Sequence, residues 1–261
     1  MIWKILKYSF SDLIRSRWSY VYLTFYLVLG FVLLFLNQNL SKAVITIMNI
    51  VVVLTPLIGT IFGIMYYYNS REFVELLLAQ PIRRSTIFIG QYLGVAFSLS
   101  LSLVVGLGIP FLIYGLTQSD QILNFIALII SGAFLTFIFS GLSIYLGLLN
   151  SNKIKGFGYA ILIWLFFAVI YDGILLILLI VFEDYPLDKF TLISSFFNPI
   201  NLSRIMILLK LDISALLGYT GAVFQKFFGT GQGMFIALGM LTLWVVGPML
   251  LLVRKSGNKD F

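Results

Sequence analysis

Six stretches of this sequence stay apolar over eighteen or more residues, and no other feature limits the fold as strongly. A helix of that length crosses the ~30 Å hydrocarbon layer of a bilayer. The composition agrees, because 61% of the 261 residues are hydrophobic, only 10% are charged, and the mean hydropathy is +1.05. We therefore predict an all-α integral membrane protein with six transmembrane helices. The six stretches cover residues 18–36, 44–68, 87–116, 122–149, 157–182 and 234–253.

Lysine and arginine residues indicate how these spans are oriented. Short cytoplasmic loops of membrane proteins carry an excess of both residues. Six spans place the two termini on one side, and that side has Lys4, Lys7, Arg15, Arg17, Arg71, Arg83, Arg84, Lys153, Lys155, Arg254, Lys255 and Lys259. The other side has Lys42, Lys189, Arg204, Lys210 and Lys226. We therefore expect both termini in the cytoplasm.

Several residue types and motifs are missing, and their absence excludes much chemistry. Without cysteine there is no disulfide or thiolate ligand, and without histidine the commonest metal ligand and general base is lost. The seven methionines are dispersed, and the nucleotide-binding pattern G-x-x-x-x-G-K-[ST] does not occur. No basic stripe with interleaved aromatic residues predicts binding to nucleic acid. We therefore expect no metal, no cofactor and no catalytic residue on this chain itself.

Residues 1–17 predict an amphipathic helix that lies flat in the headgroup layer. Leu6 and Phe10 recur at helical spacing on one face, whereas Lys4 and Lys7 lie on another. Such a helix places its apolar face at the boundary between headgroups and acyl chains. The charges that interrupt its apolar residues also argue against a cleavable signal peptide. A plain basic flank ahead of the first span is the alternative.

The connection over residues 69–86 is longer than a hairpin between spans two and three requires. Its sequence, NSREFVELLLAQPIRRST, places Phe73, Leu76 and Leu77 along one helical side. Pro81 ends such a helix, because proline lacks the backbone N–H and its ring clashes with the preceding turn. We therefore predict a short amphipathic helix on the cytoplasmic side. A solvated charged loop that only sets topology is the alternative.

The outer segment over residues 183–233 is too polar for a clean span and too apolar for free solvent. Asn198, Pro199 and Arg204 interrupt its apolar residues. We predict that residues 202–211 form a helix that dips only into the outer leaflet or packs on the spans. A seventh crossing would place the basic C-terminus on the wrong side.

Asp172 is the one acidic residue well inside a predicted span. A carboxylate in the hydrocarbon layer is costly and is usually functional or paired. Two interpretations have equal weight: a polar group in a central cavity or gate, and a buried hydrogen bond to a tyrosine or hydroxyl of a neighbouring span. Arg204 of the outer segment is a further candidate neighbour, which the sequence alone does not place.

Five stretches together resemble one family of membrane proteins. They are SDLIRSRW (11–18), LTPLIG (54–59), ELLLAQPIRRSTIFIGQYLG (75–94), WLFFAVIYDGILLILL (164–179) and NPINLSRIMIL (198–208). With the order of parts described above, they resemble the type-2 permeases of ABC exporters, and the resemblance covers most of the chain. Such permeases have a flat N-terminal helix, six spans, a coupling helix between spans two and three, and a re-entrant outer segment before span six. Within that class the chain is similar to the NosY group, which serves nitrous oxide reductase maturation in NosDFY systems.

The resemblance implies that residues 1–261 form a single permease domain, which lies in a bacterial inner membrane and works with other subunits. A separate NosF-like ABC ATPase, present in two copies, would bind ATP and magnesium and would contact the coupling helix. The residues to which ATPase coupling is assigned are Glu72, Phe73, Glu75, Leu76, Leu77, Arg83 and Arg84. The residues assigned to the outer segment are Asn198, Pro199 and Arg204, and a NosD-like periplasmic protein is the partner expected there.

A second copy of the chain is also expected, because one bundle without an internal repeat has no symmetric counterpart in itself. Two patterns of small residues, Gly59 with Gly63 and Gly90 with Gly94, allow helices to approach closely. These patterns serve either the contact between copies or packing within one chain.

The chain departs from the class at one place. Members commonly have adjacent acids straight after span two and a lysine near the start of span three. This chain has Tyr68, Asn69 and Ser70 at the first position and Gln91 at the second. Charge is therefore absent at both positions.

Two mechanisms fit a permease of this kind. Either a small substrate is exported through a cavity between two copies, or ATP hydrolysis inside changes the shape of an outside partner and nothing crosses. The lack of soft ligands disfavours a copper route through the chain, and we favour transmission. A secondary transporter or channel that uses Asp172 is the alternative, although such proteins usually show matched polar sites in two halves.

Overall fold

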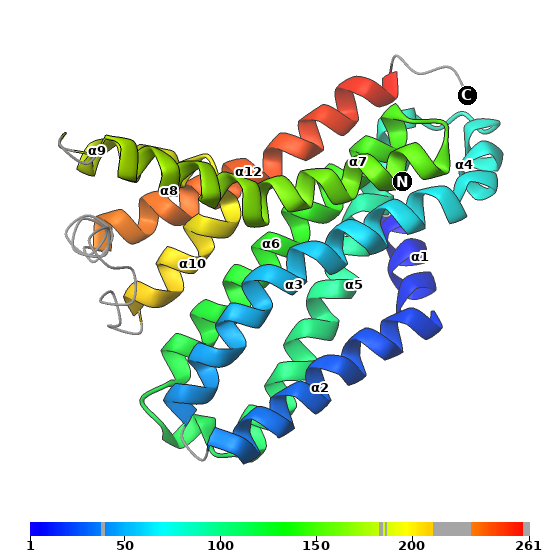
Figure 1. Ribbon diagram of the computed structural model, residues 1–261. Coiled ribbons are helices and arrows are strands. Elements are labelled where there is room, and N and C mark those ends of the chain that lie inside the picture. The colour runs from blue at the N-terminus through cyan, green and yellow to red at the C-terminus, as the bar shows by residue number, and fades with distance from the viewer. Residues whose placement is uncertain (38–39, 183–184, 186, 211–230, 258–261) are drawn as a thin grey trace.

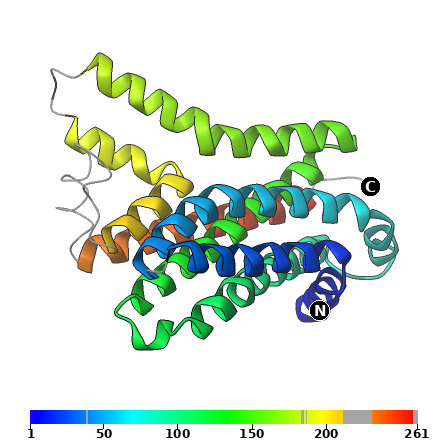
Figure 2. The ribbon, with the colours of Figure 1, turned by 60° about the horizontal axis from the view of Figure 1, so that its bottom comes forward.

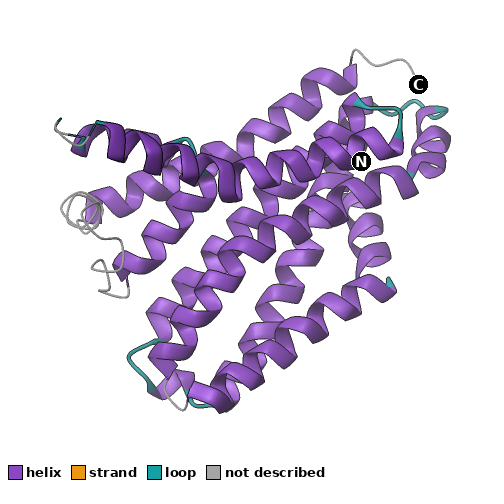
Figure 3. Ribbon diagram, in the orientation of Figure 1, coloured by secondary structure: helices purple, strands orange, loops and turns teal. Residues whose placement is uncertain are grey.

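The computed structural model describes residues 1–37, 40–182, 185, 187–210 and 231–257, and all regular structure over these ranges is helical (Figure 3). Six of these helices are long and apolar enough to cross a membrane, which confirms the predicted number of spans. They are α2 (Arg17–Asn37), α3 (Leu40–Asn69), α5 (Arg84–Ile113), α6 (Ile122–Leu149), the composite of α7 and α8 (Lys153–Val181), and α12 (Gly231–Gly257).

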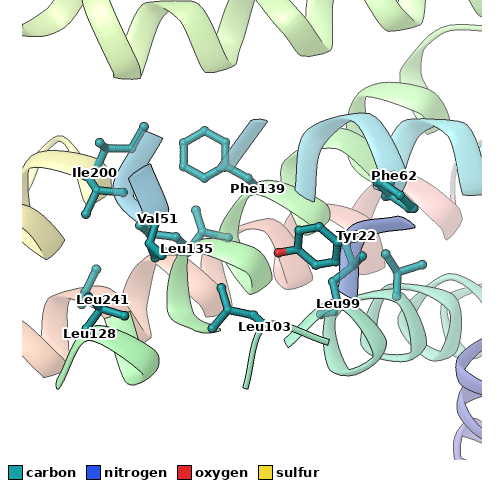
Figure 4. Packing of buried hydrophobic residues seen from close by; sticks show 14 of the residues in the cluster. Tyr22, Val51, Phe62, Leu99, Leu103, Leu128, Leu135, Phe139, Ile200 and Leu241 are labelled. Carbon is teal, nitrogen blue, oxygen red and sulfur yellow. The ribbon is translucent and has the colours of Figure 1, made fainter. Parts of the chain in front are cut away.

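The centre of the bundle is formed by α3, α5 and α6, with α12 packed against α5 and α6. Figure 4 shows Val51 of α3, Leu103 of α5, Leu135 of α6 and Leu241 of α12 in one buried cluster. Inside a bilayer, lipid tails are as apolar as these side chains, so helices associate through close packing rather than through escape from water. Small residues that let backbones approach therefore decide which helices meet.

Both small-residue patterns of the sequence pack within one chain. Gly59 and Gly63 of α3 face α6, where a Cβ on Gly63 would collide with the Ser143 hydroxyl. Gly90 and Gly94 of α5 face the N-terminal helix instead. The two patterns thus set the approach of α3 to α6 and of α5 to the N-terminal helix.

Span five is built from three parts. These are α7 (Lys153–Leu165), a π-helical turn η2 (Phe166–Ile170) and α8 (Tyr171–Val181). The indole of Trp164 ties its first half to α3 by donating a hydrogen bond of 3.2 Å to the carbonyl oxygen of Val53. No residue of η2 or α8 is buried within the chain, and Figure 2 shows the span standing apart from the rest of the bundle along much of its length.

Two short helices, α1 (Ile2–Ile14) and α4 (Arg71–Leu78), lie at the end of the bundle where α12 finishes (Figure 1, Figure 2). We refer to it as the α4 end. α4 is shorter than the predicted segment, because the helix stops after Leu78 and α5 already begins at Arg84. Pro81 accounts for the break, since it cannot donate to the preceding turn.

Toward the opposite end, α9 (Asp188–Phe196) and α10 (Pro199–Lys210) form a helical hairpin before α12. α10 packs against α3, α6 and α12, and Ile200, Ile205 and Ile207 are fully buried there. Packing on the spans, one of the two predicted arrangements, is therefore observed for α10. The rest of the predicted outer segment, residues 183, 184, 186 and 211–230, lies outside the described residues. The short 3₁₀ helix η1 (Leu116–Gln118) connects α5 to α6 at this end.

Candidate functional site

The predicted coupling helix, α4, presents two different faces. Val74 is buried, and Leu77 packs partly against the core. Leu76 is 70% exposed, and Glu72 and Glu75 are exposed beside it in the sequence. The apolar ridge predicted from the sequence is thus divided. Leu77 packs against the bundle, whereas Leu76 is exposed.

The charged residues predicted for this site are all exposed, but they do not lie on one helix. The Arg71 Nε donates to the Glu75 Oε1 across 3.1 Å within α4, with both side chains about half exposed. An exposed pair of this kind contributes little to stability. Arg83 precedes α5 and Arg84 is its first residue, so these two belong to the next helix.

α4 contacts the N-terminal helix through aromatic stacking. The rings of Tyr8 in α1 and Phe73 in α4 are stacked, with centroids 4.5 Å apart and an interplanar angle of 22°. Phe73 is therefore partly covered by this chain. Tyr8 was not predicted as a site residue. Its only signal in the sequence is an aromatic residue that lies outside the apolar stripe of an amphipathic helix.

α1 is in turn seated on α5. Its buried residues are Ile5, Ser9 and Leu13. Ile5 and Ser9 each come one residue before Leu6 and Phe10, which were expected to face the lipid. A Cβ on Gly90 would lie 2.8 Å from the Ile5 Cβ, and one on Gly94 would lie 2.6 Å from the Ser9 Cβ. Any larger residue at either glycine would push α1 away. The two glycines therefore fix where α1, and with it Tyr8, lies.

The two positions at which the chain departs from type-2 permeases are hydrogen-bonded to each other. The Gln91 Nε2 donates to the Ser70 Oγ across 2.8 Å, and the Ser70 Oγ donates to the Tyr66 carbonyl oxygen across 2.7 Å. Gln91 is fully buried. A neutral bond therefore joins α5 to the residue from which α4 starts. Both residues could be singled out from the sequence, but no pattern there indicates that they are in contact.

In span five, Asp172 is paired rather than isolated. The Arg204 Nη1 of α10 donates to its Oδ2 across 2.9 Å, and the two side chains are 27% and 25% exposed. The structure thus brings together the predicted intramembrane acid and the predicted outer-segment cation, 32 residues apart. Among the residues that the structure describes, Arg204 and Asn198 therefore lie against the Asp172 carboxylate, in place of the tyrosine or hydroxyl that was one interpretation of the sequence.

Asn198, also predicted for this region, joins the same cluster from the turn between α9 and α10. Its side-chain nitrogen donates to the Phe167 carbonyl oxygen across 2.8 Å and lies 3.5 Å from the Asp172 Oδ1. Its Oδ1 accepts from the Ile200 amide across 3.0 Å, which caps α10 behind Pro199. The π-helical turn breaks the regular α-helical bonding at Phe167, and Asn198 supplies a partner there.

Two further bonds hold the same hairpin. The Tyr171 hydroxyl of span five donates to the Ser194 carbonyl oxygen across 2.6 Å. The Trp244 indole of α12 donates to the Phe196 carbonyl oxygen across 3.0 Å. Both bonds end on α9, and the Arg204–Asp172 pair adds an attachment of α10 to span five.

Within the described ranges, no group of three or more acidic side chains comes close enough to hold a metal ion, and the chain has no histidine or cysteine. The contacts described at α4 and around Asp172 join helices of this chain to one another.

No known protein-family profile matches the chain. The chain is 24% identical over 258 residues to a probable ABC transporter permease protein NosY from Stutzerimonas stutzeri, which covers 93% of this chain and 86% of that protein. It is 23% identical over 236 residues to the protein of the same name from Pseudomonas aeruginosa, which covers 82% and 84% of the two chains. These distant likenesses confirm the resemblance to ABC transporter permeases of the NosY kind.

Proposed function

We propose that the chain is the membrane-spanning permease subunit of an ABC transporter and that a separate ATPase drives it through α4. The observation that carries this proposal is the division of α4 into an inner face fixed on the bundle and an outer face centred on exposed Leu76. A helix held on one side and open on the other can transmit force from a partner. The likeness to NosY-type permeases supports the identity of that partner.

α4 is linked to three other helices, so a displacement of α4 reaches much of the bundle. Ser70 continues from α3, Gln91 joins it to α5, and Tyr8 joins it to α1. ATP binding can shift the membrane part only if the ATPase has different affinities for its two conformations. The exposed Leu76 and the charges of Glu72 and Glu75 provide a contact surface for such a difference.

The orientation of the complex follows from this assignment. The α4 end faces the cytoplasm of a bacterial cell, with both termini on that side, and the chain lies in the inner membrane. Two copies meet around a two-fold axis, each with one NosF-like ATPase that binds ATP and magnesium.

Force transmission to an outside partner is our favoured mechanism. The α9–α10 hairpin is bonded to span five through Asp172 and Tyr171 and to α12 through Trp244. Movement of these spans would carry the hairpin with them, and a NosD-like periplasmic protein bound there would change shape. A role in nitrous oxide reductase maturation is the setting that the NosY likeness suggests for this proposal.

A charge-reversed variant tests the proposal. The tagged chain is purified from its own organism with its ATPase, and ATP hydrolysis is compared for the wild type, the double variant Glu75→Lys with Arg83→Glu, and Tyr114→Ala at the opposite end. We expect the double variant to lose co-purifying ATPase and turnover by about tenfold, as for loss of ~1.4 kcal/mol of binding. Tyr114→Ala should retain both. Unchanged assembly and turnover in the double variant would reject α4 as the contact.

A further inference from the structure

A groove of about 590 Å³ lies between α1 and α5, apart from the residues assigned to ATPase coupling. Its apolar walls are formed by Trp3, Leu6 and Phe10 of α1 and by Phe97 and Leu101 of α5. Phe97 and Leu101 are each about 45% exposed, although they lie in a transmembrane helix. The groove is therefore an apolar surface that this chain leaves partly open.

The way α1 is seated explains the groove. Ile5 and Ser9 sit on Gly90 and Gly94, so the helix touches α5 along that line. Leu6 and Phe10 follow Ile5 and Ser9 by one residue each, which turns them about 100° around the helix axis. Leu6 and Phe10 therefore lie beside the line of contact with Gly90 and Gly94 and form one wall of the groove.

The groove also has a polar side. Lys7 and Ser11, four residues apart on α1, complete its lining. An ammonium group and a hydroxyl together can donate to a phosphate. Among the described residues no acidic group forms an ion pair with Lys7. A ligand for this groove thus needs an anionic group next to a long apolar part.

The surrounding charge has the same sign. The first seventeen residues contain one acidic residue, Asp12, and four basic ones: Lys4, Lys7, Arg15 and Arg17. Clusters of basic residues at the membrane surface attract anionic lipids, and an amphipathic helix places such residues at headgroup depth. The basic residues, the headgroup depth expected for an amphipathic helix and the apolar walls of the groove all suit an anionic lipid.

We propose that this groove binds one anionic phospholipid of the membrane leaflet in which α1 lies. The Lys7 ammonium and the Ser11 hydroxyl donate to the phosphate, and one acyl chain lies along Phe97 and Leu101. The bound lipid fills the space between α1 and α5 and so steadies the helix that carries Tyr8. This site differs from the contact with the ATPase, and it does not depend on that contact.

Native mass spectrometry of the delipidated, purified chain tests the proposal. The probes are phosphatidylglycerol and phosphatidylethanolamine, added at equal concentration. We expect one phosphatidylglycerol per chain to be retained, and Lys7→Gln to weaken its retention about fivefold, the effect of losing one cation at a membrane surface. Lys4→Gln, which removes a cation of the same helix outside the groove lining, should weaken it less than Lys7→Gln.

A second variant separates the groove from general attraction of charge. Leu101→Trp fills the groove without changing charge, and Leu112→Trp places the same bulk at another exposed position of α5. We expect only Leu101→Trp to abolish retention, with both variants monodisperse and equally helical. Equal retention of the two lipids by the wild type, or full retention by Leu101→Trp, would overturn the proposal. Loss of ATPase coupling in the α4 variants would leave this result unchanged, so the two proposals fail separately.

Discussion

α4 and the α9–α10 hairpin are both short helical elements attached to the spans, but they are attached by different chemistry. α4 is joined to its neighbours by a neutral hydrogen bond, Gln91 to Ser70, and by stacking of Tyr8 on Phe73. The hairpin is joined to span five by an ion pair between Arg204 and Asp172. Leaving a buried neutral donor without its partner costs ~1–3 kcal/mol, whereas leaving a buried charge unpaired costs ~3–5 kcal/mol.

This difference suggests a division of roles. α4 can shift against α1 and α5 while a partner moves, because no buried charge is exposed to hydrocarbon when its links loosen. The hairpin and span five should move as one unit, because separating Asp172 from Arg204 is unfavourable at every intermediate position.

Placing a charge in the neutral link should be the most damaging change. Gln91→Lys buries an ammonium group without an acidic partner, and we expect it to lower the free energy of unfolding by ~3–5 kcal/mol. Adding Ser70→Glu should recover part of this loss, because the two groups are hydrogen-bonded in the wild type. Thermal unfolding in detergent, followed by tryptophan fluorescence, measures both. Equal melting temperatures for Gln91→Lys and the wild type would contradict a closed, buried link.

Breaking the ion pair should have the next largest effect. Arg204→Gln leaves the Asp172 carboxylate unpaired, and we expect a loss near the lower end of ~3–5 kcal/mol, because both side chains are about a quarter exposed. The double variant Asp172→Asn with Arg204→Gln should cost less than the sum of the single changes. Additive losses in the same melting assay would mean that the two residues are not coupled.

Displacing α1 should cost less. A Cβ on Gly94 would meet the Ser9 Cβ at 2.6 Å, so Gly94→Ala should lower the free energy of unfolding by ~1–3 kcal/mol. Gly108, in the same helix, has no atom within 4 Å of such a Cβ, and Gly108→Ala is the matched control. Stability unchanged by both substitutions would show that α1 is not held on the glycines.

The stack between Tyr8 and Phe73 should give the smallest change in stability. Tyr8→Ala removes an aromatic contact of ~0.5–1.5 kcal/mol, whereas Tyr8→Phe keeps the ring. We expect Tyr8→Ala to weaken the stimulation of ATP hydrolysis by the permease while the melting temperature falls only slightly. Normal stimulation of ATP hydrolysis by Tyr8→Ala would show that α1 does not transmit force from the ATPase.

Much of the fold could be predicted, because the membrane imposes a length and a composition on each span. The window over residues 122–149 coincides with α6, and the short helix after span two was expected before Pro81. α4 does end before the proline, at Leu78, and Arg83 and Arg84, which were assigned to the segment over residues 69–86, lie at the start of α5.

The contacts of the candidate site were harder to predict. Asp172 and Arg204 stood out singly, because charges are rare in apolar segments, but their pairing depends on how the hairpin folds back on span five. Tyr8 and Phe73 meet only because Gly90 and Gly94 seat α1 across α5. Neither contact follows from spacing along one helix, so sequence periodicity carries no signal for them.

Binding of an ATPase to the exposed face of α4 can be measured directly, because the chain has no native cysteine. In the purified complex, Leu76→Cys is treated with a maleimide, and Tyr185→Cys, of nearly equal exposure at the opposite end, is the control. We expect the ATPase to slow labelling at position 76 at least about tenfold relative to the isolated chain, and position 185 to react equally in both samples. Equal labelling of position 76 with and without the ATPase would contradict the account.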